Sequence, residues 1–370
     1  MEAPHSLATS IKSVRFNEGS RIPFACMISF DFLPDSERAR AMDARMRGEL
    51  LSSLNSICAQ TRAQDAALSR SLEPVATVTK KFANRTTPFP PALFAAYYQL
   101  VLTLVHDADA LDEKVLQLVE VATDADSAFV ARFKDLSEAA LGGPARLDLY
   151  RFALDTDPAF YFKFQSPTPE CSQRTIFSIE RALRLMTRTA PALREEFDAL
   201  VHELILAASP EGPGAVGFDG ASSYMLWGAL ALSVDERQSD LQRMETLAHE
   251  CAHSLLFGFS IDEPLVLNDD SDRYSSPVRQ DPRPMDGIYH ATYVSARMHY
   301  AMCSARNSGL LDDAQQAEVQ ARMASSERAF FSGLSVVEAH ADLSPTGQAV
   351  MEAAVAYMRS AASGGPSGAS

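Results

Sequence analysis

Residues 249–253 form a His-Glu-x-x-His motif, a pattern whose residue types could bind and use a metal ion. His249 and His253 are four residues apart, so on a helix their imidazoles project from one face, one turn apart. Two such imidazoles can bind one divalent metal at about 2.0–2.1 Å. Glu250 is rotated by roughly 100° from His249 and is expected to face a metal-bound water rather than the metal. The flanking residues are apolar: Leu247, Ala248, Ala252 and Leu255. Paired histidines on a buried helix need partners, so the motif predicts a metal site.

A catalytic metal also needs a third protein ligand and an open coordination position. His290, in the later segment 281–294, is the strongest candidate. Asp286, one turn before it, is the carboxylate alternative and would complete the two-His-one-carboxylate set of non-haem iron. Glu263 lies within reach in sequence. The metzincin extension is excluded, because Leu256 and Phe259 stand where it requires a glycine and a third histidine.

Arginines near His290 could bind a carboxylate. Arg297 lies two turns after His290, on the same face of the expected helix. A guanidinium offers planar donors to both carboxylate oxygens, which suits that role. Arg283 and Arg279, in the loop before this helix, are the second choices.

Three other features are interpreted as structural. Residues 212–217 fit a dinucleotide-binding glycine pattern, but they follow a helical stretch and do not open a helix after a strand, so they predict a turn. His202 and Glu203 lack a second histidine four residues on, and we expect both at the surface. Cys251 points away from the expected ligand face and is interpreted as a core residue.

Hydrophobic periodicity predicts a mainly α-helical fold, a helical scaffold with a small β element packed on a zincin-like motif helix. Helices are expected at residues 36–69, 92–106, 111–123, 127–141, 174–188, 191–208, 240–257 and 285–308. A strand is expected at residues 225–234, after the Gly-, Pro- and Ser-rich stretch 209–223. We therefore divide the chain into a mostly helical N-terminal region, 1–208, a metal-binding catalytic region, 209–360, and a disordered tail, 361–370.

The composition narrows the classes of partner. The 370 residues carry 48 acidic and 33 basic side chains, a formal net charge of −15, which disfavours nucleic acid and membrane surfaces. Five scattered cysteines without a Cys-x-x-Cys motif suit a reducing cytosol. The N-terminal residues do not resemble a signal peptide, and the most apolar stretch, 92–105, is too short to span a bilayer. We expect a soluble cytoplasmic protein and leave its oligomeric state open.

The C-terminal 150 residues or so resemble the HExxH-type alpha-ketoglutarate-dependent peptide beta-hydroxylases of ribosomal peptide natural-product pathways. The resemblance rests on residues 247–253, on residues 283–290 with Tyr293-Val294 and Ala296-Arg297, and on the closing residues 343–347. It implies iron(II) held by His249, His253 and His290 (or Asp286), with Arg297 or Arg283 on the distal carboxylate of alpha-ketoglutarate. A Cβ hydrogen of a precursor-peptide residue would be abstracted, and Glu250 would orient a ligand or water.

Two other classes of function stay open. In a zinc-dependent HExxH metallopeptidase, Glu250 would be the general base and the strand at 225–234 would bind an extended peptide at its edge. In a non-enzymatic helical binding module, the motif would be structural. Metal content and turnover would separate these classes.

Overall fold

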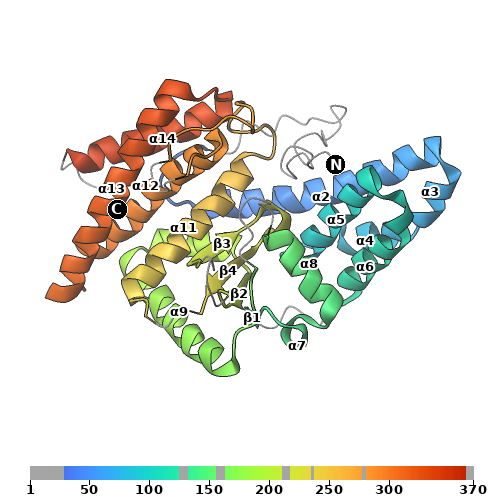
Figure 1. The fold of residues 1–370 in the computed structure, drawn as a ribbon, viewed down its shortest axis with the longest axis horizontal. Coiled ribbons are helices and arrows are strands. Elements are labelled where there is room, and N and C mark those ends of the chain that lie inside the picture. The colour runs from blue at the N-terminus through green and yellow to red at the C-terminus, as the bar shows by residue number, and fades with distance from the viewer. Residues whose placement is uncertain are drawn as a thin grey trace. The chain divides into compact units, whose positions relative to one another are not determined.

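A computed structural model describes residues 29–124, 132–155, 163–210, 217–234, 237–276 and 281–363 (Figure 1). The described residues are 69% helix and 7% strand, with a four-stranded sheet, which confirms the expected mainly α fold with a small β element. It divides into two compact units. Among the described residues, unit 1 comprises those within 41–172 and 201–234, and unit 2 comprises those within 29–40, 173–200 and 237–363.

The units are discontinuous in sequence and differ from the expected division at residues 208 and 209. Residues 173–200 belong to unit 2, whereas residues 209–234 belong to unit 1. The tail expected at residues 361–370 begins later than predicted, because a helix, Pro345–Ala362, includes its first two residues. The rest of the expected tail, residues 364–370, lies outside the described residues.

Unit 1 combines short helices with the sheet. Its elements are α2 (Ser36–Gln64, which begins in unit 2), α3 (Ala66–Ser71), α4 (Val75–Phe82), α5 (Pro91–His106), α6 (Leu111–Asp124), β1 (Phe133–Asp135), α7 (Glu138–Leu141), α8 (Pro144–Leu154), β2 (Glu203–Ala207), β3 (Gly220–Ser222) and β4 (Ala229–Ser233). The strand order is β1-β2-β4-β3; β2 is parallel to β1 and β4, and β3 is antiparallel to β4. Both β2 and β4 are buried throughout, which explains their nearly unbroken apolar runs.

Three sequence predictions in unit 1 are wrong. The expected helix at 127–141 contains β1 and only the short helix α7, and residues 125–131 lie outside the described residues. The expected helix at 191–208 ends at Leu200 and gives way to β2. Short apolar runs such as β2 cannot be distinguished from buried helix by periodicity alone, because both faces of the strand are covered.

The third error concerns the strand expected at 225–234. Its first residues form a 3-10 turn, η4 (Tyr224–Leu226), and only β4 is extended. Gly228 separates them with φ +88°, and a Cβ there would lie 2.9 Å from His202 Cδ2. A side chain at this position would therefore be both strained and obstructed.

Unit 2 is a packed set of long helices. It contains most of α9 (Pro169–Thr189), with α10 (Pro191–Leu200), α11 (Asp240–Phe259), α12 (Met285–Asn307), α13 (Asp313–His340) and α14 (Pro345–Ala362). α12 packs between α11 and α13, and α10 packs on α11. The periodicity at 240–257 and 285–308 therefore predicted α11 and α12 to within two residues at each end.

Side-chain caps fix where the unit 2 helices begin. Ser239 accepts from the Gln242 amide at the start of α11, and Asp312 forms a capping box with Gln315 at the start of α13. At the start of α14, Gly347 lies so close to Leu265 that an added Cβ would be 2.0 Å from its carbonyl oxygen. No helix in the described ranges is long and apolar enough to cross a membrane.

Candidate metal centre

Three histidines meet where α11 and α12 pack together; we call His249, His253 and His290 the histidine cluster. His253 Nε2 lies 3.1 Å from His249 Nε2, and His253 Nδ1 lies 3.0 Å from His290 Nδ1. The ring centroids are 4.8 Å apart for the first pair and 5.3 Å for the second. The structure thus brings the motif pair together with the expected third histidine.

The helices position the cluster at a partly open face. Within α11 the four-residue spacing of the motif stacks His249 and His253 on one side, against α12. All three histidines are half-buried, whereas most residues beside them on both helices are buried. The His249 side chain is 34% exposed. The cluster is therefore supported by the packed helices and partly exposed to solvent.

Burial keeps the imidazoles of His249 and His253 neutral. It lowers the pKa of His249 to about 4. The pKa of His253 is held well below its ordinary value, first by burial and then by the neighbouring rings of His249 and His290. Neutral imidazole is the form that binds metals, since its nitrogen lone pair is then available.

The donor types suit a divalent metal, although the three rings do not all face one position. The 3.1 Å separation of the two Nε2 atoms matches two nitrogens bound to one ion at about 2.0–2.1 Å. His253, however, presents a different nitrogen to each neighbour, Nε2 to His249 and Nδ1 to His290. Within the described ranges, no three or more His, Cys, Asp or Glu side chains are arranged to hold one metal ion. A shared position therefore requires the ring of His253 or His290 to turn.

Glu250 lies beside the cluster. It is buried, with 4% of its surface exposed, and its Oε1 lies 3.9 Å from His249 Nε2. This is the ring nitrogen that also faces His253. The carboxylate is thus close to where a ligand of the cluster would bind, as the motif predicts.

Sequence reasoning did not identify two further neighbours of the cluster. Met298 Sδ lies 3.3 Å from His249 Nδ1, the nitrogen that points away from His253. The Phe257 ring lies 6.4 Å from His253 and 5.8 Å from His290, centroid to centroid. Phe257 is four residues after His253, a signal already present in the sequence, whereas Met298 becomes recognisable only once the pairing of α11 with α12 is known.

The carboxylates considered as third ligands have other surroundings. Asp286 lies half-buried in the first turn of α12, where its charge complements the helix N-terminus. Glu263 Oε1 accepts a hydrogen bond of 2.9 Å from the backbone amide of Thr346, at the start of α14. His290 is the candidate that reaches the motif pair.

Arg297 has partners that compete with a ligand carboxylate. Its side chain is buried, forms an ion pair with Glu196, and donates a hydrogen bond of 2.7 Å to the Phe32 carbonyl. The same glutamate accepts from Arg38 at 2.9 Å. The guanidinium therefore holds α12 to α10 and to the segment before α2.

Arg283 lies at the start of α12, with its Nε 2.9 Å from Asp281 Oδ2. Its backbone amide donates to the Tyr274 carbonyl and its carbonyl accepts from the Tyr274 amide, which fixes the loop before the helix. Arg279, the other candidate of this loop, lies outside the described residues.

The residues interpreted as structural also need one correction. The expectation that His202 and Glu203 lie at the surface is wrong, because their side chains are only 8% and 3% exposed. Glu203 accepts from Tyr150 Oη at 2.6 Å and from Lys134 Nζ at 2.7 Å. These partners allow a charged residue to begin the buried strand β2. Cys251 is buried as expected, and burial raises the pKa of its thiol.

No protein-family model matches this chain, and no match was found among curated proteins. The histidine cluster is therefore the feature from which a function is inferred. Three half-buried imidazoles with an adjacent carboxylate have the chemistry to hold a metal that polarises or oxidises a substrate.

Proposed function

We propose that the protein is an iron(II)- and alpha-ketoglutarate-dependent hydroxylase that oxidises the Cβ position of a residue in a ribosomally made precursor peptide. The observation that carries the proposal is the meeting of His249, His253 and His290 at 3.0–3.1 Å on a partly open face. These three histidines would hold the metal, and Asp286 is set aside as the third ligand. A cytoplasmic location would suit both iron(II) and the scattered cysteines.

Iron(II) would supply the oxidising chemistry: alpha-ketoglutarate is oxidised to succinate and carbon dioxide, and one atom of dioxygen enters the peptide C–H bond. The protein's own residues would bind and orient the reactants. The buried Glu250 would orient a ligand or a water molecule beside His249. Phe257 and Met298, both half-buried, would give the site an apolar rim that limits access of water.

Arg283 replaces Arg297 in this proposal as the residue that binds the distal carboxylate of alpha-ketoglutarate. Arg297 is buried in an ion pair with Glu196, and moving it would leave that carboxylate in a buried site without one of its partners. Arg283 is only half-buried and precedes the helix that carries His290. Its ion pair with Asp281 involves a carboxylate that is 55% exposed. Replacing this partner with the ligand carboxylate would therefore cost little free energy.

A zinc-dependent peptidase is the second candidate, and one observation favours it. Glu250 Oε1 lies 3.9 Å from His249 Nε2, close enough to accept a proton from a water bound at the cluster. The strand expected to bind the peptide, however, has no open edge: β4 pairs with β2 on one side and with β3 on the other. A peptidase would therefore have to bind its substrate elsewhere.

Turnover by wild type and by Glu250→Gln distinguishes the candidates. The protein is incubated with a peptide library and iron(II), with or without alpha-ketoglutarate, and succinate and peptide masses are followed. A hydroxylase should form succinate and add one oxygen atom, and Glu250→Gln should retain activity reduced by about 10–100-fold. Peptide cleavage without alpha-ketoglutarate, abolished by Glu250→Gln with the metal retained, would establish the peptidase instead. Neither reaction would point to a binding module.

A further inference from the structure

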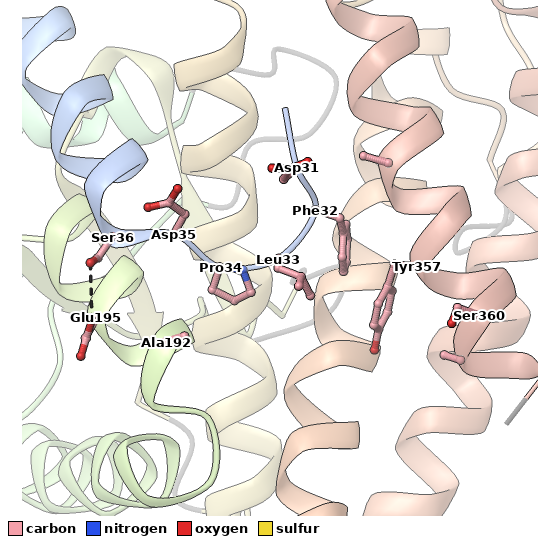
Figure 2. A pocket seen from close by; sticks show the side chains of 12 residues that line it. Asp31, Phe32, Leu33, Pro34, Asp35, Ser36, Ala192, Glu195, Tyr357 and Ser360 are labelled. Atoms are coloured by element: carbon pink, nitrogen blue, oxygen red, sulfur yellow. Dashed lines mark hydrogen bonds between the residues drawn. The ribbon is translucent and has the colours of Figure 1, made fainter. Parts of the chain in front are cut away.

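A hollow of about 600 Å³ lies in unit 2, lined by residues 31–36, α10 and α14 (Figure 2). We call residues 31–36 the strap. Leu33 and Pro34 of the strap lie between Ala192 and Glu195 of α10 on one side and Tyr357 and Ser360 of α14 on the other (Figure 2). No role in the proposed reaction has been assigned to these residues.

The backbone of the strap is held firmly from behind. Arg38 donates to the carbonyls of Asp31 at 2.5 Å and Leu33 at 3.0 Å, and Arg297 donates to the carbonyl of Phe32. Both guanidinium groups pair with the buried Glu196. Main-chain groups fixed in this way give the hollow a preformed floor, which lowers the entropic cost of binding a ligand.

The α14 wall is fixed as well. The Phe32 ring stacks on Tyr357 with centroids 4.4 Å apart and planes 17° apart. Tyr357 Oη lies 3.0 Å from His299 Nδ1 on α12. An aromatic face held in this way is suited to contact with an aliphatic or cationic group.

The lining combines negative charge with apolar surface. Asp31, Asp35 and Glu195 contribute carboxylates, and the described lining residues include no lysine, arginine or histidine. Leu33 lines the same hollow and is 43% exposed, a large apolar side chain left in contact with water. A cation with an aliphatic stem, flanked by an apolar side chain, complements both properties.

We propose that the hollow binds a basic segment of the peptide substrate, a lysine or arginine next to an apolar residue. This inference rests on the proposed function, because it names the substrate class of the same enzyme. Arg297 and His299, which hold the walls, lie seven and nine residues after His290 on α12. That spacing is about 10–14 Å along the helix axis, so the basic residue lies several positions away from the residue that reacts.

Peptide binding to the full-length, metal-free protein tests the proposal. The probes are fluorescein-labelled peptides with a Leu-Lys-Leu sequence in a Gly/Ser background, and versions with Gln or Glu in place of Lys. We expect the Gln peptide to bind about 5–10-fold more weakly and the Glu peptide more weakly still, with binding of the Lys peptide reduced by salt. The double variant Asp31→Asn, Glu195→Gln should weaken the Lys peptide to the level of the Gln peptide.

Two variants complete the test. Leu33→Ser should weaken all three peptides, because it removes the shared apolar contact. Glu180→Gln is the control: it removes a partly exposed acidic charge on α9, outside the hollow, and should leave binding unchanged. Circular dichroism checks that each variant is folded.

The proposal is overturned if the Lys, Gln and Glu peptides bind alike, or if the double variant binds the Lys peptide as wild type does. It is also overturned if Leu33→Ser changes only the sedimentation of the protein, since the hollow would then cover a second copy of the chain. Binding requires no metal, so its outcome is separate from that of the reaction. Peptides that bind as expected but are never hydroxylated would support the hollow and contradict the proposed function.

Discussion

His253 is the central residue of the histidine cluster, because one of its ring nitrogens faces His249 and the other faces His290. An imidazole can direct only one nitrogen at a given metal ion, so binding requires one ring of the cluster to turn. The rings that would have to turn, those of His253 or His290, belong to half-buried side chains. The residues supply the donors, and the metal would fix their final orientation.

Substitution of His290 should remove one metal ligand. We expect His290→Ala to weaken cobalt(II) binding to the metal-free protein at least about 100-fold, since even residues that only orient ligands typically account for 10–100-fold. Asp286→Asn is the control: affinity should stay within about twofold, with about 0.3–1 kcal/mol less stability from the lost charge at the helix N-terminus. The opposite pattern in isothermal titrations would identify Asp286 as the ligand.

Met298 should tune the metal affinity through His249. A thioether is a weak acceptor, but at 3.3 Å from Nδ1 it favours the tautomer with the proton on that nitrogen, which leaves Nε2 free to bind the metal. Met298→Leu keeps the volume, removes the acceptor and should weaken cobalt(II) binding about 10-fold, and Met298→Gln should restore it. Met302→Leu, at a buried position one turn further along α12, should have no effect. If Met298→Leu, Met298→Gln and Met302→Leu all bind cobalt(II) as tightly as wild type, Met298 only fills space.

At the scale of elements, a buried charge cluster fastens α10, α12 and the strap together. Glu196 lies at its centre, fully buried, and pairs with Arg38 and Arg297. Removing one member of a buried ion pair is costly, because the charge that remains is buried without its partner. Arg297, on the same helix as His290, therefore stabilises the fold through its ion pair with Glu196.

Arg297 and Arg283 should thus differ in what their substitution changes. Arg297→Met should lower the free energy of unfolding by about 3–5 kcal/mol. It should leave the alpha-ketoglutarate affinity of the folded protein unchanged. Arg283→Met should weaken that affinity with little loss of stability. Arg181→Met, which breaks an exposed pair with Asp240, is expected to cost at most about 1 kcal/mol. Weaker alpha-ketoglutarate binding by folded Arg297→Met, measured calorimetrically, would return the role to Arg297.

The two helices of the site could be predicted from the sequence, but most of the sheet could not. In α11 and α12, long periodic patterns with a capping Ser239 or an initiating Pro284 define the element and its start. β1 and β2 are short, and Phe133 pairs with Leu204 across a long stretch of chain, so their structure depends on distant contacts. The partners of Arg297 were missed for the same reason: Glu196 is 101 residues away in sequence.

At the scale of the whole molecule, the chain passes between the two compact units several times. A composition change such as that at residues 209–223 marks a loop, but it does not mark the limit of a unit built from separated segments. The complete histidine cluster, the strap and the hollow belong to unit 2. We therefore expect a loss of stability in unit 2 to disturb the histidine cluster and the hollow together.

Acid should destabilise the metal-free protein before its carboxylates are protonated. Burial, then the nearby Arg306, lowers the pKa of His299 to about 4, and burial lowers that of His249 similarly. The unfolded chain binds more protons than the native one between about pH 6.5 and 4, so the free energy of unfolding falls as the pH falls through this window. His299, which is 5% exposed, should contribute up to about 1.4 kcal/mol per pH unit. Denaturant titrations at pH 7, 6 and 5 measure the slope, and His299→Gln should reduce it; an unchanged slope would contradict this assignment.

The proposed iron(II) and alpha-ketoglutarate site is tested most directly by anaerobic absorption spectroscopy of the iron(II)-loaded protein during titration with alpha-ketoglutarate. If the three histidines hold iron(II) and the keto acid chelates it, a visible charge-transfer band should appear and saturate at one alpha-ketoglutarate per chain. His290→Ala should lose the band, and Asp286→Asn should keep it. Absence of the band in iron-loaded wild-type protein, together with peptide cleavage by the zinc-loaded form, would contradict the proposed hydroxylase and favour the peptidase.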